Sequence, residues 1–289
     1  MNHLLCFGFG FSAQALAKRL DPSHWRVTGT SRSAAGAAKI TAQGFEGVVF
    51  DALDSIPKTV THIVSSAPPD ANGDPVLLRF SEGLKAAAQH VKWVAYLSTT
   101  GVYGDHAGAW IDEETALTPN TERGSRRVAA EATWVALWHA HGLPVHVFRL
   151  AGIYGPGRNV FLSLLNGTAK RVIKENQIFS RIHVEDIAGV LEASLHRPNP
   201  GRCYNVADDF PCPPQDVVLY AAEMLAVAPP PETPFAEAEL SPMARSFYAD
   251  SKRTRNNRVK EELGYQFQYP TYHEGLAAIF AELQHEPLA

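Results

Sequence analysis

The sequence predicts an α/β fold in which a parallel, doubly wound sheet is followed by a smaller C-terminal substrate lobe. Short apolar runs alternate with helical patterns over the first 150 residues. Runs such as 93–98 (WVAYLS) show almost no polar alternation, as expected for strands covered by helices on both faces. The first run leads into a glycine-rich turn and then a helix. Together these features indicate a Rossmann-type sheet.

The expected elements follow this rhythm along the chain. Strands are predicted at 3–7, 25–30, 46–50, 61–66, 93–98, 144–150 and 202–207. Helices are predicted at 12–20, 34–43, 75–90, 123–141, 161–169, 185–196, 256–263 and 272–284. In the helix at 75–90 we expect Leu77, Leu78, Leu84 and Ala88 to form one buried face. In the helix at 123–141 the corresponding face is Val128, Ala132, Val135 and Trp138.

Composition excludes several classes of protein. Hydrophobic residues make up 45% and charged residues 19% of the 289 residues, as in an ordinary globular protein. The net charge of −4 does not favour a nucleic-acid partner. Three cysteines without CxxC spacing and twelve scattered histidines suggest neither a disulfide framework nor a metal site. The N-terminus has no basic leader and too few apolar residues for a membrane span, so we expect a cytoplasmic protein without a membrane partner.

The glycine-rich turn predicts a dinucleotide site. Residues 8–13 read GxGxxA between a strand and a helix. Gly8 permits the tight turn, Gly10 lets the backbone approach a pyrophosphate, and Ala13 keeps helix and strand close. The phosphate then lies at the helix N-terminus formed by Phe11 and Ser12, where free N–H groups and the helix dipole favour anions.

The end of the second strand favours NADP over NAD, which stays the alternative. NAD-binding proteins usually carry an Asp or Glu there, on the ribose hydroxyls. This chain has Ser31 and Arg32 and no acid. The guanidinium of Arg32 could pair with the 2′-phosphate of NADP, or could be an ordinary solvated arginine.

The same pattern suggests domain boundaries. Residues 1–154 form the predicted dinucleotide-binding domain, completed by about 181–208. Residues 155–180 and 209–289 form the predicted substrate lobe. Within it, the proline-rich stretch 227–234 is interpreted as a rigid surface connection.

Four further motifs now fall in order, and together they resemble the extended short-chain dehydrogenase/reductase family, in its NAD-dependent epimerase/dehydratase branch. They are STTGVYG at 98–104, YGPGR at 154–158, HVEDIA at 183–188 and YNV at 204–206. The resemblance extends from Gly8 to about Gly275. It implies an active site in a cleft between the two domains, substrates that are often nucleotide sugars, and dimers in many members, so a homodimer is a modest expectation.

The resemblance also assigns individual residues. It implies that Asp51, after the third strand, meets the adenine, and that Ala67 and Pro68 lie along the cofactor. Thr99 matches the catalytic Ser/Thr of the family. Tyr103, four residues later, is expected to line the cleft, more often as a substrate contact or packing residue than as a proton donor.

The chain departs from the family at its catalytic pair. Counting back from Glu131 places Arg127 where the family has a lysine and Arg123 where it has a tyrosine. Arginine has no exchangeable proton near neutral pH, so Arg123 cannot act as the acid/base. Arg127 could still hold the ribose hydroxyls of the nicotinamide nucleoside. The alternative is that Arg123, Arg126 and Arg127 form a solvated helix face.

The substrate is therefore expected to be a small molecule, anionic or nucleotide-sugar-like. Its expected contacts are Arg123, Tyr154, Arg158 and His183, although His183 is more often a structural residue that ties the lobes together. The sequence favours an NADP-dependent epimerase/dehydratase-like oxidoreductase with a replaced acid/base. The alternatives are a non-catalytic NADP-binding sensor and an isomerase or hydrolase without redox change.

Overall fold

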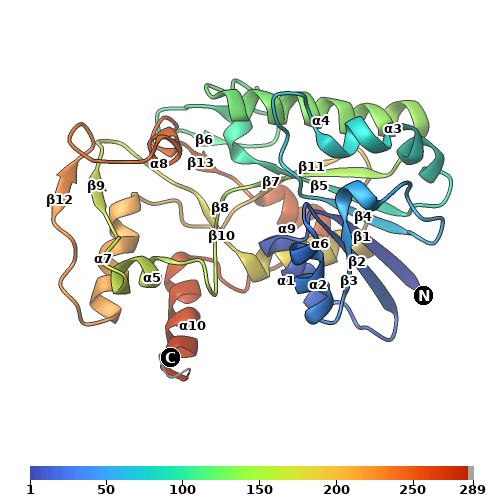
Figure 1. Ribbon diagram of the computed structural model, residues 1–289. Helices are drawn as coiled ribbons and strands as arrows, with labels where there is room; N and C mark the ends of the chain where they lie inside the picture. The colour runs from blue at the N-terminus through green and yellow to red at the C-terminus, as the bar shows by residue number, and fades with distance from the viewer. Residues whose placement is uncertain (286–289) are drawn as a thin grey trace.

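The centre of the molecule is a seven-stranded parallel sheet. The computed structural model describes residues 1–285 (Figure 1). The strands of the sheet are β1 (Asn2–Phe7), β2 (Trp25–Ser31), β3 (Glu46–Val49), β4 (His62–Ser65), β5 (Trp93–Thr99), β7 (Val145–Leu150) and β11 (Cys203–Val206). Their order is β11-β7-β5-β4-β1-β2-β3, so the direction of winding reverses between β1 and β4. This confirms the predicted Rossmann-type α/β fold, which places a ligand at the carboxyl edge beside this reversal.

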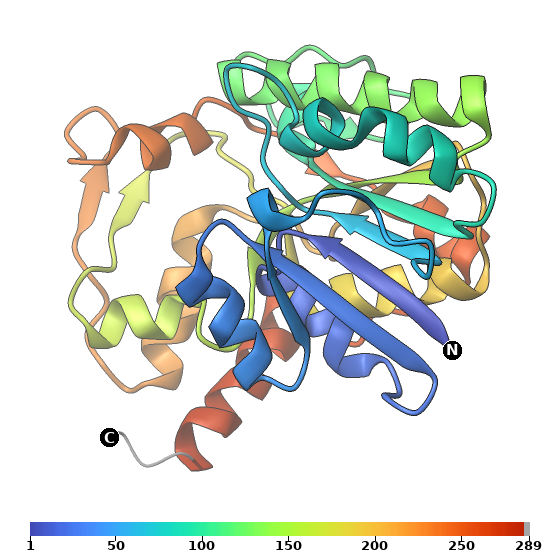
Figure 2. The same ribbon diagram turned by 45° about the vertical axis from the view of Figure 1, so that its right-hand side comes forward.

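Helices cover both faces of the sheet, as Figure 2 shows. One face carries α3 (Pro75–Ala87) and α4 (Glu122–His141), and the other carries α1 (Phe11–Arg19) and α6 (Val184–His196). The helix α2 (Ala34–Ala42) lies beside β2 and β3. Successive side chains of a strand point to opposite faces of the sheet. In β1, Leu4 and Cys6 pack with α1, whereas Leu5 and Phe7 pack with α3. Nearly every position of β1, β4, β5 and β7 is therefore buried, which explains the near-continuous apolar runs.

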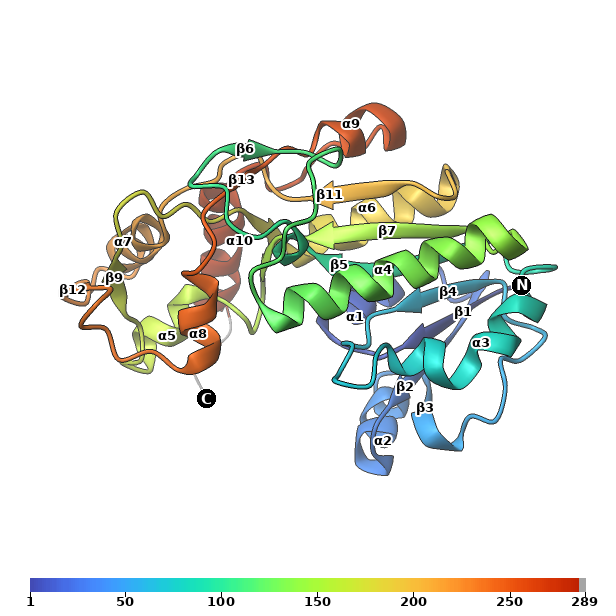
Figure 3. The same ribbon diagram turned by 90° about the horizontal axis from the view of Figure 1, so that it is seen from above.

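The helix α4 packs on β5 and β7; it begins at the carboxyl edge of the sheet and runs back toward the start of β7 (Figure 3). The Thr121 hydroxyl accepts a hydrogen bond from the Gly124 amide (3.1 Å) and caps its start. Gly142 ends it in the left-handed conformation, with φ of 75°. These two caps fix the register that puts Arg123 in the first turn and Arg127 in the second.

The two predicted helix faces are confirmed in part. In α3, Leu84 is buried and Leu77 and Ala88 pack partly buried against the core, but Leu78 is 63% exposed, and the buried Val76 and Phe80 were not predicted. In α4, Val128, Val135 and Trp138 are partly buried and Ala132 is exposed, while the most deeply buried apolar residues are Ala130, Trp134 and Leu137. Packing against neighbouring elements decides which apolar positions of a helix turn inward.

The second lobe is built from short elements. Its helices are α5 (Val160–Leu165), α7 (Pro214–Met224), α8 (Pro242–Phe247) and α10 (Tyr272–His285), while α9 (Asn257–Leu263) packs back on α6 and β11. Three parallel strand pairs join β8 (Gly152–Tyr154) to β10 (Arg181–His183), β9 (Arg171–Ile173) to β12 (Glu232–Pro234), and β6 (Trp110–Ile111) to β13 (Arg253–Thr254). Phe161, Val217 and Leu276 centre its core.

Two sequence expectations in this lobe need correction. The helix expected at 161–169 ends at Leu165, because Gly167 takes a left-handed backbone (φ 66°). The end of the proline-rich stretch is a strand: residues 232–234 form β12 and pair with β9. Among residues 1–285, no helix combines the length and apolarity needed to cross a membrane.

Candidate functional site

The glycine turn after β1 is held rigidly by both neighbouring strands. Gly8 has a φ of 84°, and its amide donates to the Thr30 hydroxyl at 2.9 Å. The Ser66 hydroxyl, just after β4, donates to the Gly8 carbonyl at 2.7 Å. A Cβ at Gly8 would lie 2.9 Å from that hydroxyl oxygen. Only glycine combines this backbone conformation with this approach.

The N-terminus of α1 is open to an anion. No side chain caps it, and Gln14 supplies the first amide that returns to the Gly10 carbonyl (2.9 Å). A Cβ at Gly10 would meet no atom within 4 Å, so it would point into open space above the turn. Ala13 is fully buried against the sheet, as expected for the last position of the motif. Uncapped helix amides beside an open path to the Gly10 backbone are the arrangement that binds a pyrophosphate.

The neighbouring strand ends carry the remaining predicted cofactor contacts. Arg32 follows β2, is exposed, and forms no ion pair with any residue in 1–285. Asp51 lies exposed in a 3-10 turn (Phe50–Ala52) after β3. Ala67 and Pro68 follow β4. All of these residues therefore lie at the carboxyl edge that also carries the glycine turn.

The loop after β5 is fixed against α4. Thr99 ends the strand, and its hydroxyl accepts a hydrogen bond from the Gly101 amide (3.1 Å), which starts the 3-10 helix η2 (Thr100–Tyr103). A Cβ on Gly124 of α4 would lie 2.8 Å from the Gly101 carbonyl oxygen. The first turn of α4 thus packs directly on the segment that begins with Thr99.

The expectation that Tyr103 lines the cleft is wrong. Its side chain is fully buried, with an exposure of 0%. The hydroxyl donates to Asn205 Oδ1 (2.8 Å) and accepts from Arg149 Nη1 (2.7 Å). Arg149 in turn forms a buried ion pair with Glu131 (2.8 Å). Burial raises the pKa of the Tyr103 hydroxyl far above its usual value. Tyr103 therefore belongs to a polar network that joins η2, α4, β7 and β11.

Arg127 is buried rather than solvated, being only 8% exposed. It donates through Nη1 to the Leu97 carbonyl (2.7 Å) and to the Tyr96 hydroxyl (3.0 Å). These contacts hold its guanidinium against the end of β5, two residues before Thr99. The solvated-face alternative is wrong for Arg127 but fits Arg123, which is exposed, and Arg126, which is half-buried and pairs with Glu122.

Arg123 and Arg158 add positive charge without a matching acid. Arg123 lies 5.9 Å from the centre of the Phe247 ring. Burial and the charges of Arg127 and Arg158 lower the pKa of Arg123. Of the ion pairs that residues 1–285 form, none includes Arg123, Arg127 or Arg158. Three guanidinium groups thus share one region without neutralisation, an arrangement that favours an anionic ligand.

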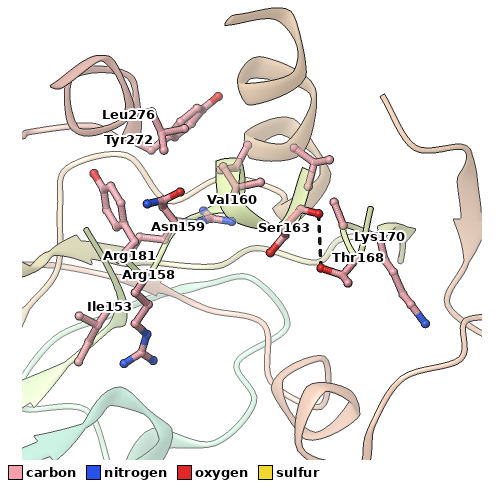
Figure 4. A pocket seen from close by; sticks show the side chains of 14 residues that line it. Ile153, Arg158, Asn159, Val160, Ser163, Thr168, Lys170, Arg181, Tyr272 and Leu276 are labelled. Carbon is pink, nitrogen blue, oxygen red and sulfur yellow. Dashed lines mark hydrogen bonds between the residues drawn. The ribbon is translucent and has the colours of Figure 1, made fainter. Parts of the chain in front are cut away.

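A pocket of about 400 Å³ opens in the second lobe, between β8, α5, α7 and α10 (Figure 4). Tyr154 and Arg158 line it, as predicted for substrate contacts. Arg181 lines it too, and sequence reasoning missed this residue, although it lies two residues before the HVEDIA motif.

His183 does not line this pocket. It is 2% exposed, and its Nδ1 accepts a hydrogen bond from the Glu185 amide at 3.3 Å, capping α6. Its ring packs edge-on against Tyr154 and lies 4.1 Å from the Tyr269 ring. Burial lowers the pKa of His183 to about 4. These contacts support the structural interpretation of His183 and correct its placement among the substrate contacts.

Comparisons with known proteins agree with this geometry. Residues 8–207 match the model of the NAD dependent epimerase/dehydratase family. Protein YeeZ of Escherichia coli K12 is 27% identical over 286 residues, which cover 93% of this chain and 97% of that protein. A solved structure of a functionally unknown conserved protein from Silicibacter pomeroyi is 51% identical, with a TM-score of 0.93, covering 98% of this chain and 100% of that one.

A more distant structure shows the fold alone. The dTDP-glucose 4,6-dehydratase of Bacillus anthracis, solved in complex with NAD, is 18% identical with a TM-score of 0.75. The alignment covers 99% of this chain and 97% of that chain.

Proposed function

This chain belongs to the NAD dependent epimerase/dehydratase family, and we propose that it is an NADP-preferring oxidoreductase acting on a small anionic or sugar-derived substrate. The observation that carries the proposal is the uncapped start of α1 beside Gly10, at the carboxyl edge where the sheet reverses its winding. Helix amides there can bind a pyrophosphate. The adjoining strand ends supply Asp51, Ala67 and Pro68 as further proposed contacts of the dinucleotide.

The preference for NADP rests on Arg32. This arginine follows β2 without a protein partner among residues 1–285, and no acid competes for the ribose at that strand end. A guanidinium can hold the 2′-phosphate through two charge-assisted hydrogen bonds, and Ser31 can add a hydroxyl. NAD lacks that phosphate and gains nothing from Arg32.

Titration of NADPH and NADH against the protein tests this preference. NADPH should bind more tightly, and Arg32→Ala should narrow the gap by about ten- to a hundredfold, because such a contact contributes roughly 1.5–3 kcal/mol. Arg26→Ala is the matched control, since Arg26 lies at the opposite end of β2 and pairs with Glu46. Equal affinities of the unaltered protein for the two nucleotides would refute the preference.

The chemistry of the site follows from its two arginines. When bound, the nicotinamide ring would supply or accept a hydride. Arg127, held at the end of β5 by the Leu97 carbonyl, keeps free N–H groups that can bind ribose hydroxyls. Arg123 provides charge but no proton. With Tyr103 buried, a proton would come from water held at Thr99 or from the substrate itself.

A second candidate is a non-catalytic NADP-binding sensor. It is favoured by the missing acid/base. The Tyr103 hydroxyl is hydrogen-bonded to Arg149 and Asn205, and arginines occupy the positions where the family has its catalytic tyrosine and lysine. An acid/base group contributes typically 10²–10⁴ in rate, so carbonyl reduction should be slow. A substrate screen followed by NADPH absorbance separates the candidates. Turnover of any compound above the buffer rate excludes the sensor, and its absence across carbonyl and sugar-derived anions excludes the oxidoreductase.

A further inference from the structure

We infer that the pocket in the second lobe binds an organic anion with an apolar body, a carboxylate or phosphate monoester, in preference to a nucleotide sugar. The inference depends on the proposed function in one respect only, that the bound compound is the substrate. The binding itself is argued from the pocket and does not need the cofactor.

The pocket is positively charged, and the protein leaves most of this charge without a counter-ion. Arg158, Lys170 and Arg181 line it, and the lining contains no Asp or Glu. The Lys170 ammonium group donates a hydrogen bond to the Glu239 carbonyl. Arg181 uses only Nη1, on the Phe179 carbonyl (3.2 Å) and Cys212 Sγ (3.0 Å). The side chain of Arg158 forms no hydrogen bond with any residue in 1–285. Two guanidinium groups therefore keep donors for a ligand.

A buried acid close to Arg181 does not cancel this charge. Asp208 is 1% exposed, and burial raises its pKa to about 8, although the charge of Arg181 pulls it back toward lower values. Burial therefore favours the neutral form of this carboxyl. Among residues 1–285, its Oδ2 atom has no hydrogen-bond partner and forms no ion pair with Arg181. The charge of Arg181 remains available to an anion that enters the pocket.

One side of the wall is apolar and buried. Val217, Tyr272 and Leu276 are 8%, 5% and 1% exposed, and Val160 adds a further aliphatic side chain. In Figure 4, Leu276 and Tyr272 lie on the side of the pocket away from Arg158. A ligand that places its anion on the arginines therefore directs its other end against hydrocarbon and an aromatic ring.

Two of the uncharged polar side chains in the lining are already hydrogen-bonded within the protein, whereas the Tyr154 hydroxyl is buried without a partner among residues 1–285. Asn159 caps α5 by accepting from the Leu162 amide (3.2 Å), and its own amide donates to the Gly155 carbonyl (3.1 Å). The Thr168 hydroxyl donates to the Ser163 carbonyl (3.4 Å). Sugar hydroxyls and base edges buried without partners would cost binding free energy. An apolar body avoids this cost.

Calorimetric titration of the full-length protein, with and without NADP⁺, tests the inference. The probes are 4-phenylbutyrate, phenyl phosphate, the neutral 4-phenylbutan-1-ol and UDP-glucose. We expect one or both aromatic anions to bind, and the alcohol and UDP-glucose to bind at least tenfold more weakly. Arg181→Gln should weaken the anions about tenfold or more, since it removes a charge-assisted contact. Arg202→Gln, a surface arginine paired with Glu262, should leave binding unchanged.

A second variant keeps the test decisive if Arg181→Gln is unstable. Val218→Trp fills the pocket and retains both arginines, so it should abolish anion binding. The inference is overturned if UDP-glucose binds more tightly than either anion, if the neutral alcohol equals them, if no anion binds, or if a folded Val218→Trp binds them normally. NADP⁺ titration of the same proteins separates the two proposals. If the unaltered protein does not bind NADP⁺, the proposed function is refuted, whereas this inference about the pocket is not affected.

Discussion

Replacing Tyr103 by phenylalanine should destabilise the protein and leave cofactor affinity unchanged. The substitution removes the hydroxyl that bridges Arg149 Nη1 (2.7 Å) and Asn205 Oδ1 (2.8 Å). The hydrogen bond from the charged Arg149 contributes about 1.5–3 kcal/mol and the one to Asn205 about 0.5–1.5 kcal/mol. Because both partners stay buried without a replacement, we expect a loss of about 2–4 kcal/mol in the free energy of unfolding.

Thermal unfolding measures this loss. An unfolding entropy of about 2.1 cal/mol/K per residue gives about 0.6 kcal/mol/K for a chain of this length, so Tm should fall by about 3–7 °C. Tyr220→Phe is the control, since no hydrogen bond of the Tyr220 hydroxyl is found within residues 1–285. An unchanged Tm for Tyr103→Phe, together with a tenfold loss of turnover, would refute the assignment of Tyr103 to the buried network. It would indicate instead that the Tyr103 hydroxyl faces the cleft.

Two other perturbations follow from the structure. Gly10→Val should abolish NADPH binding in a titration while circular dichroism shows an intact fold, because its side chain would occupy the open space over the start of α1; normal binding would place the phosphate elsewhere. Burial lowers the pKa of His62, His146 and His183 to about 4. Below about pH 6.5 these histidines are therefore protonated in the unfolded chain but stay neutral in the folded chain. Each histidine then costs about 1.4 kcal/mol per pH unit as the pH falls toward 4, while Asp208, with its raised pKa, acts oppositely. Urea unfolding should therefore show a net loss of roughly 2–3 kcal/mol from pH 6 to pH 5, and a flat profile would contradict this.

The Rossmann half could be predicted well from the sequence because its strands are buried on both faces. The runs at 93–98 and 144–150 lie within one residue of β5 and β7. The start of α1 was equally clear, since Gly8, Gly10 and Ala13 have separate steric reasons to occur in that order. Such local causes are visible in a single sequence.

The second lobe was harder because its elements are short or begin with weak signals. Strands of two or three residues, such as β8 and β13, are too short to show a period. The helix α7 went unpredicted, although Pro214 at its start and the spacing of Val217 and Ala221 are typical helix features. Arg181 was missed because it lies two residues before the recognised motif.

Tyr103 shows what pattern alone could not decide. Its partners Arg149 and Asn205 are 46 and 102 residues away in the sequence. Whether a tyrosine after a strand end faces a cleft or an internal network depends on these distant residues. Arg127 is similar: the sequence allowed a solvated arginine, and only the approach of the Leu97 carbonyl shows that it is buried.

The most direct test of the proposed function is a crystal structure of the protein grown with NADP⁺. We expect the pyrophosphate on the first amides of α1, above Gly10, with the 2′-phosphate on Arg32 and the ribose hydroxyls of the nicotinamide nucleoside on Arg127. A dinucleotide bound with its pyrophosphate away from α1, or with its 2′-phosphate in solvent and Arg32 turned aside, would contradict the account.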